Sequence, residues 1–348
     1  MDERTASPGS TVPTSGRPFQ TARWLGGGHR QTVVPALLAA DPVPGATVRT
    51  VEVEPGTSVE LHVNRVADWS PGVRSRGTVL LVHGLGGHAE SRYMRRSARQ
   101  ALDRGWDVVR LNLRNCGGTE ALASTLYNAG QSDDIGAVLR SLETLELPDG
   151  ERLPRPFGIV SFSLGAGQVL LHAGEAGAAC AADAIVAVNP PVDLEATRQS
   201  MQRPSNTLYH WRYTRSLCEL IDRIRVLRPV EGPAARWWRI RSVYVFDQLF
   251  TIHGTPHATV EDYYAAASPG PLLGNVTTPT LILASVDDPV VPVESFVPYD
   301  TSPGHPLRIE YPSSGGHVGF WQRGEPRYWA AERALDFIEA ETGIGSGR

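Results

Sequence analysis

Short apolar runs alternate with amphipathic stretches along most of the chain. Residues 78–82 and 157–160 are almost wholly apolar, have the length of a buried strand, and are each followed by small or polar residues. Strands that are apolar on both faces are typical of parallel sheets with helices packed on each side. The pattern therefore predicts an α/β architecture with a mostly parallel sheet.

The same pattern predicts eight strands. Residues 48–53 are rich in Val and Thr, and residues 59–65 alternate apolar and polar positions, so we expect these two strands to form an antiparallel pair at one edge. The other six are predicted at residues 78–82, 106–113, 157–160, 184–188, 280–284 and 307–311. Helices are predicted around residues 92–102, from about residue 164 and from about residue 327.

One segment, residues 194–268, breaks this alternation: it has no strand pattern and is rich in aromatic residues and arginine. We interpret it as a helical cap inserted after the sixth strand, where a fold of this kind builds its ligand pocket. Six aromatic residues of the cap could line an apolar acyl site: Tyr209, Trp211, Tyr213, Trp237, Trp238 and Phe250. For each of them, packing inside the cap is the alternative.

The cap belongs to one predicted domain, residues 17–342. Residues 1–16 are rich in Ser, Thr, Pro and Gly and are predicted to form a disordered arm, and residues 343–348 a flexible tail. The arm has no apolar run typical of a signal peptide, and no stretch approaches the roughly 18 apolar residues of a membrane span. We expect a cytoplasmic protein without a stable membrane anchor.

Composition narrows the function classes. Of the 348 residues, 41% are hydrophobic and 20% charged, as in an ordinary globular protein. The formal net charge of −4 provides no overall basic field, so nucleic acid and anionic lipid are not expected partners. Three cysteines stand far apart without CxxC spacing, which argues against a disulfide framework and a zinc site.

The nucleophile candidate is Ser163, in the sequence Ser161-Phe162-Ser163-Leu164-Gly165 between a predicted strand and a helix. A serine on such a sharp turn, with small neighbours two residues away, is typical of the nucleophile elbow of α/β-hydrolases. Ser161 stands where glycine is usual. Residues 83–87, His-Gly-Leu-Gly-Gly, follow an earlier buried strand, so the backbone N–H groups of Leu85 and Leu164 are the candidate oxyanion donors.

The acid and base candidates follow the last two strands. We prefer Asp288 as the acid because it directly precedes the Pro-Val-Val-Pro run at residues 289–292; Asp287 and Asp193 remain alternatives. His317 is the base candidate, since flanking glycines suit a loop that must approach Ser163. The resulting order Ser, Asp, His is that of α/β-hydrolases.

A metal site or a cofactor is not expected. His253 and His257 share a short loop, but no acidic or cysteine partner stands at ligand spacing. The expected ligand is a small-molecule ester.

Several blocks together resemble the YheT-like branch of the α/β-hydrolases, the AB hydrolase 4 family. The most specific is residues 315–321, Gly-Gly-His-Val-Gly-Phe-Trp. The resemblance begins at residues 24–32, which include the signature Gly-His-Arg-Gln-Thr at 28–32. Further matching blocks are residues 83–87, 114–118, 127–130, 246–247, 262–264 and 287–289. The chain departs from the family pattern at Ser161, Ala166, Asn115 and Asn128.

The resemblance implies a serine esterase that hydrolyses carboxylic esters of short to medium acyl chains, with the triad at Ser163, Asp288 and His317. One alternative is an acyltransferase or tailoring enzyme that passes the same acyl group to an alcohol or amine. Another is a non-catalytic binding protein that retains the fold.

Overall fold

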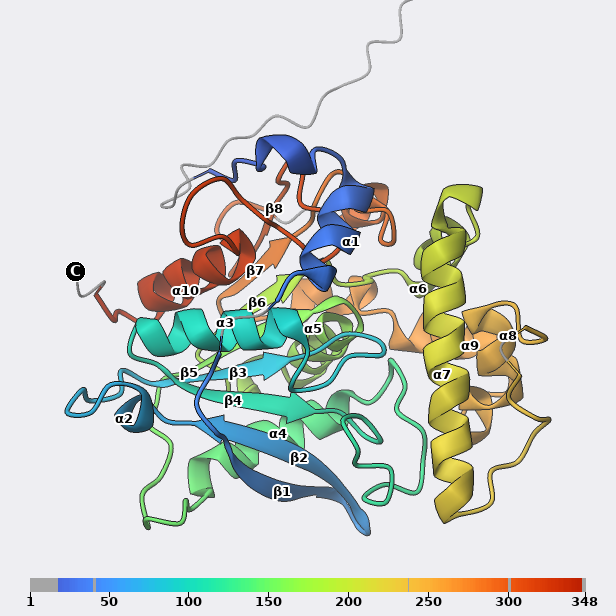
Figure 1. The fold of residues 1–348 in the computed structure, drawn as a ribbon, viewed down its shortest axis with the longest axis horizontal. Helices are drawn as coiled ribbons and strands as arrows, with labels where there is room; N and C mark the ends of the chain where they lie inside the picture. Colours follow the sequence, from blue (N-terminus) through green and yellow to red (C-terminus); the bar gives the residue numbers. More distant parts are fainter. Residues whose placement is uncertain (1–17, 40–41, 237, 300–301, 346–348) are drawn as a thin grey trace, which may run out of the picture.

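A computed structural model of the chain describes residues 18–39, 42–236, 238–299 and 302–345. It confirms the predicted sheet of eight mostly parallel strands flanked by helices (Figure 1). The strands are β1 (Thr47–Glu54), β2 (Thr57–Asn64), β3 (Thr78–Val82), β4 (Asp107–Asn112), β5 (Phe157–Phe162), β6 (Ala184–Val188), β7 (Thr280–Leu283) and β8 (Leu307–Glu310). The predicted arm at residues 1–16, the end of the tail at 346–348 and Trp237 lie outside the described residues.

Ten α-helices are present in the part of the chain that the structure describes. They are α1 (Gly28–Leu37), α2 (Val66–Trp69), α3 (Arg92–Asp103), α4 (Ser132–Thr144), α5 (Ser163–Ala176), α6 (Leu194–Met201), α7 (Thr207–Leu227), α8 (Val243–Leu249), α9 (Val260–Ala267) and α10 (Trp329–Glu341). The three helices predicted from the sequence correspond to α3, α5 and α10. None of these described helices is both long enough and apolar enough to cross a bilayer.

The strand order is β1-β2-β4-β3-β5-β6-β7-β8. β2 pairs antiparallel with both β1 and β4, and all later pairs are parallel. The expectation that the first two strands both lie at the edge is therefore wrong for β2, which is an interior strand. Its inward positions are buried against the neighbouring strand and helix, whereas β1 is half exposed.

Successive residues of β3 point to opposite faces of the sheet. Leu80 packs in a core with α4 and α5, and Val79 packs in a second core with α3 and α10. Both faces are thus covered, which explains why β3 is apolar at four consecutive positions, Val79 to Val82.

The parallel strands end at one edge of the sheet, and this edge carries the candidate site. β3 is followed there by His83, β5 by Ser163, and β7 and β8 by the loops of Asp288 and His317. Helices α6 to α9 form the cap beside this edge (Figure 1). The described residues of the predicted cap segment hold no strand, so the cap is helical as expected.

Candidate active site

Ser163 lies on the turn that joins β5 to α5. Its φ of 51° is in the left-handed region, which is rare for a residue with a side chain. The turn needs its small neighbours: a Cβ on Gly165 would lie 2.2 Å from the carbonyl oxygen of His83. Ser161 stands at the usual glycine position, where its buried hydroxyl donates a hydrogen bond to the carbonyl of Val186, at 3.0 Å.

The structure brings Ser163, His317 and Asp288 together. The Nε2 atom of His317 lies 2.7 Å from Oγ of Ser163, and its Nδ1 atom lies 2.8 Å from Oδ2 of Asp288. The side chains of His317 and Asp288 are almost completely buried. The carboxylate of Asp288 also accepts hydrogen bonds from the backbone N–H groups of Val290 and Val291, at 2.7 and 3.2 Å. These bonds fix the orientation of the carboxylate.

The two alternative acids have other partners. Asp193 caps α6 by accepting a hydrogen bond from the backbone N–H of Ala196. Asp287 points away from the imidazole and accepts hydrogen bonds from the hydroxyls of Ser285 and Ser314 and from the backbone N–H of Gly316. Asp287 therefore ties the loop of the acid to the loop of the base.

Asn189, directly after β6, is a site residue that sequence reasoning missed. Its side-chain amide donates hydrogen bonds to the carbonyls of Gly316 and His317, at 2.8 and 2.5 Å, and its Oδ1 atom accepts one from the N–H of Ser285, at 2.7 Å. Its φ of 46° suits asparagine better than most residues. In the sequence, the only sign of this role was an asparagine between a predicted strand and two prolines. The same pattern is equally typical of an ordinary strand end.

The first helix braces the base from the other side. The hydroxyl of Thr32 accepts a hydrogen bond from the backbone N–H of His317, at 2.9 Å, and donates one to the carbonyl of Gly28. Gln31 exchanges two hydrogen bonds with the backbone of Trp321. A Cβ on Gly28 would collide with the carbonyl oxygen of Asp287, only 1.6 Å away. The two motifs that begin and end the family resemblance thus pack directly against each other.

The candidate oxyanion donors flank the nucleophile. A Cβ on Gly84 would lie 3.4 Å from Oγ of Ser163, so the loop after β3 runs close beside it. The N–H groups of Gly84 and Gly86 donate to the hydroxyls of Tyr93 and Tyr127. Between them, the N–H of Leu85 has no acceptor within the described ranges. Leu164 is in the first turn of α5, where N–H groups have no acceptor inside the helix.

A pocket opens beside Ser163 between the strand ends and the cap. Its apolar lining comes from both sides and consists of Leu85, Leu164, Pro191, Leu194, Met201, Leu217, Val243, Val290 and Val291. Four tyrosines that were not singled out as pocket residues also line it: Tyr127, Tyr244, Tyr263 and Tyr264.

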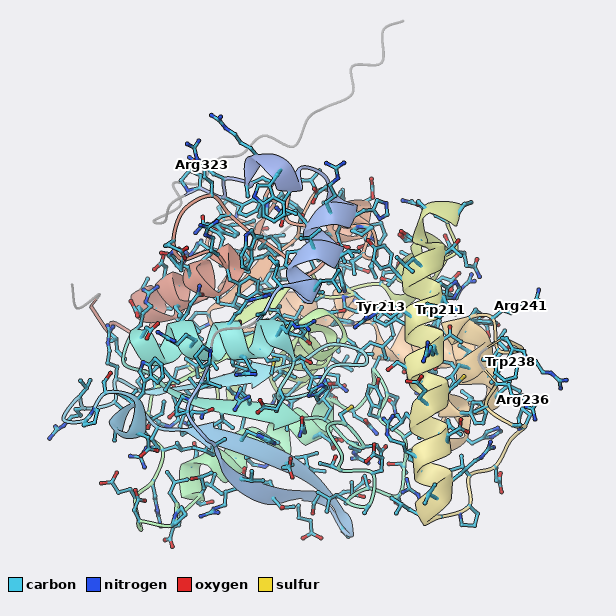
Figure 2. All side chains as sticks on the ribbon, viewed as in Figure 1. Trp211, Tyr213, Arg236, Trp238, Arg241 and Arg323 are labelled. Atoms are coloured by element: carbon cyan, nitrogen blue, oxygen red, sulfur yellow. The ribbon has the colours of Figure 1, made fainter. Side chains whose placement is uncertain are left out.

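Of the described cap aromatics proposed from the sequence, only Tyr213 lines this pocket. Figure 2 shows it on the side of α7 that faces the sheet. Tyr209 is buried against His29, at 3.0 Å from its Nδ1 atom, and Phe250 packs on a neighbouring phenylalanine inside the cap. Trp211 and Trp238 are exposed. For Phe250 the alternative, packing inside the cap, therefore holds, and Tyr209, Trp211 and Trp238 do not line the pocket either. On α7 the reason is the helical period, which turns only every third or fourth residue inward.

Burial shifts the pKa values of several titratable groups near the site, among them His83 and Asp247. Burial lowers the pKa of His83 to about 4, so this imidazole is neutral and bridges the carbonyl of Gly84 and the N–H of Leu113. Desolvation raises the pKa of Asp247, in the pocket wall, from its ordinary 3.8 to about 6. Its carboxylate accepts hydrogen bonds from the hydroxyls of Thr251 and Tyr264. In the described part of the chain, no three His, Cys, Asp or Glu side chains are grouped so as to hold a metal ion.

Comparisons with known proteins support the α/β-hydrolase fold. Residues 77–323 match the model of the alpha/beta hydrolase fold. The chain is 27% identical over 336 residues to "Putative esterase YheT" of Escherichia coli, covering 93% of this chain and 94% of that protein. It is 28% identical over 270 residues to an "Abhydrolase domain-containing protein" of Dictyostelium discoideum, covering 75% of this chain and 66% of that protein. The solved structure of the Pyrococcus furiosus esterase Pf2001 has the same fold, with a TM-score of 0.55, 15% identity, and coverage of 87% of this chain and 97% of that one.

Proposed function

Because the chain belongs to the α/β-hydrolase fold family, we propose that it is a serine esterase that hydrolyses carboxylic esters with short to medium acyl chains. Ser163 is the nucleophile, His317 the general base, and Asp288 orients the imidazole. The continuous series of hydrogen bonds from Ser163 through His317 to Asp288 is the observation that supports this most directly. The similarity to the protein named "Putative esterase YheT" supports the reaction class.

The first half of the reaction acylates Ser163. Nε2 of His317 accepts the hydroxyl proton while Oγ attacks the ester carbonyl carbon, whose π electrons move to the oxygen. Asp288 accepts a hydrogen bond from the Nδ1–H group and does not take the proton. This bond selects the tautomer with a free lone pair on Nε2 and stabilises the imidazolium. When the tetrahedral intermediate collapses, the C–O bond to the alcohol breaks and Nε2–H gives the alkoxide its proton.

In the tetrahedral intermediate, the former carbonyl oxygen carries a negative charge and accepts hydrogen bonds from the N–H groups of Leu85 and Leu164. Two fixed backbone donors stabilise this charge without reorganisation, and the loss of one such donor typically costs about 10²–10³-fold in rate. The hydrogen bonds of Gly84 and Gly86 to tyrosine hydroxyls hold the loop on either side of Leu85.

The second half of the reaction removes the acyl group. A water molecule gives a proton to Nε2 of His317 and attacks the acyl carbon, and Oγ of Ser163 leaves with the proton returned by the imidazole. The apolar side chains around Ser163 provide a site for the acyl chain.

Covalent labelling tests this proposal. The intact mass of the full chain is measured after treatment with a fluorophosphonate, for wild type, Ser163→Ala and the matched control Ser161→Ala. We expect one phosphonyl adduct on wild type and on Ser161→Ala, and none on Ser163→Ala. No adduct on folded wild type, or an adduct that persists in Ser163→Ala, would contradict the assignment of the nucleophile.

A further inference from the structure

The charge of the chain is distributed very unevenly. Residues 203–241 contain nine arginines and three acidic residues, a net charge of +6. Since the whole chain carries −4, the remainder carries −10. The net charge of the whole chain is negative, and for that reason no anionic partner was expected. One part of the cap is nevertheless strongly basic.

This basic segment folds back on itself. After α7 ends, the guanidinium of Arg225 donates hydrogen bonds to the carbonyls of Val230, Gly232 and Pro233. Farther along, the N–H of Val243 donates to Nε2 of His210, near the start of α7. Residues 230–236 and 238–243 therefore run back along α7. Ala235 and Ile240 are buried in the same core as the inner side of the helix, and the described residues next to them along the chain are exposed.

The exposed side chains of this layer combine arginine with tryptophan. Trp211 and Trp238 are 41% and 53% exposed, and the guanidinium groups of Arg215 and Arg236 lie 5.5 and 5.6 Å from the centroids of their rings. Figure 2 shows Trp211 on α7, with Arg236, Trp238 and Arg241 at the outer edge of the cap. We call this surface the Arg–Trp face; it comprises Trp211, Arg212, Arg236, Trp238, Arg239 and Arg241.

The charge of the Arg–Trp face is not neutralised locally. Arg215 pairs with Glu219 and Arg223 with Glu120. By contrast, Arg212, Arg236, Arg239 and Arg241 form no ion pair with any residue that the structure describes, and all four are exposed. Five of the eleven large hydrophobic side chains that are exposed among the described residues also belong to this segment: Leu208, Trp211, Val226, Leu227 and Trp238.

We infer that the Arg–Trp face docks onto an anionic lipid surface. Arginine supplies attraction to negative headgroups, worth about 1 kcal/mol per residue near a membrane. Indole rings are favoured at the boundary between water and acyl chains, and arginine can bury its aliphatic stem there while its charge stays in water. The exposed tryptophans favour a lipid surface over nucleic acid or an acidic protein.

The Arg–Trp face and the pocket lie on opposite sides of α7, so docking would place the pocket near the lipids. Tyr213 and Leu217 line the pocket from the inner side of α7, whereas Trp211 and Arg212 are exposed on the same helix. A helix with side chains is about 10–12 Å across, so a docked cap would bring the pocket close to the lipids. The docking itself does not depend on catalysis.

Vesicle co-sedimentation tests the inference on the Ser163→Ala full chain, which keeps the proposed catalysis out of the measurement. We expect binding to phosphatidylglycerol–phosphatidylcholine vesicles, weak binding to pure phosphatidylcholine, and loss of binding at high salt. The triple variant Arg236→Gln/Arg239→Gln/Arg241→Gln should bind about 100-fold more weakly, at roughly fivefold per arginine. Trp211→Phe/Trp238→Phe should lose most of the fluorescence quenching by brominated lipid.

The matched control is Arg23→Gln/Arg74→Gln/Arg323→Gln, which removes the same charge from exposed positions outside the cap and should retain binding. Circular dichroism establishes that each variant is folded. The inference would be overturned if the parent did not bind anionic vesicles, or if the two triple variants bound equally weakly. It would also be overturned if the parent bound heparin or duplex DNA but not vesicles, which would indicate a different acidic partner.

Discussion

The two sides of the pocket are built differently. On the sheet side, polar groups hold one another at defined distances: Asp287, Asn189 and Thr32 all bind the loop that carries His317. On the cap side, the helices supply apolar and aromatic side chains to the pocket together with several polar ones, and the outer surface is charged.

We infer that the sheet side positions the reacting groups and that the cap side selects the substrate. Reacting atoms must be held within fractions of an ångström, and hydrogen bonds from several loops provide this. An acyl chain needs only apolar volume, which packed helices supply with more tolerance for substitution. We therefore expect variants on the sheet side to change the rate and variants on the cap side to change substrate preference, lipid binding or stability.

The largest effect should distinguish the two adjacent carboxylates. Asp288→Asn should lower kcat by about 10⁴-fold, because an amide facing Nδ1 no longer selects the reactive tautomer. Asp287→Asn should lower kcat by at most about 10²-fold, since an amide oxygen can still accept the N–H of Gly316. Steady-state hydrolysis of p-nitrophenyl esters measures both, and the reverse order would refute the assignment of the acid.

A smaller loss of rate is expected from Asn189→Ala. Without the amide, the loops of Ser285 and His317 lose their shared anchor, and a displacement of about 1 Å at the base should lower kcat by about 10²-fold. The matched control is Asn64→Ala, which removes a buried asparagine with two side-chain hydrogen bonds far from the pocket. Both variants should lose about 1–3 kcal/mol of unfolding free energy. Equal kcat values in the two would show that Asn189 has no positioning role.

On the cap side, Met201→Trp should change selectivity rather than chemistry. Met201 lines the pocket, so a larger side chain removes space for the acyl chain. We expect kcat/KM to fall by about 10–100-fold for the longest accepted ester and to change little for acetate. Val226→Trp, on an exposed position of α7, is the control and should leave the chain-length profile unchanged. A uniform loss over all chain lengths would argue against this site for the acyl chain.

The smallest effect concerns the pH dependence of stability. Asp247 has a folded-state pKa raised by burial above its ordinary value, so the folded state becomes less stable, relative to the unfolded chain, as the pH rises from about 4 to about 6. Asp247→Asn removes this ionisation. The unfolding free energy of the variant minus that of wild type should therefore increase by about 2–3 kcal/mol between pH 4 and pH 7. Urea unfolding at both pH values measures this difference, and a constant difference would contradict it.

Much of this architecture was readable from the sequence. Buried parallel strands need apolar residues on both faces, so β3, β5, β6 and β7 stood out as short apolar runs, and the loops after strand ends supplied the nucleophile, acid and base candidates. Local chemistry was also informative at Ser163, where small neighbours are required by the close approach of strand and helix.

The sequence by itself thus determined where the strands lie along the chain, the helical cap and a short set of candidate residues. Only the tertiary structure decided which carboxylate meets His317, which aromatic side chains enter the pocket, and that Asn189 and Thr32 hold the base. These outcomes depend on contacts between residues far apart along the chain, such as Thr32 and His317, which are 285 positions apart. Local propensity and periodicity report on neighbours, whereas such contacts are set by how the loops at the strand ends pack together.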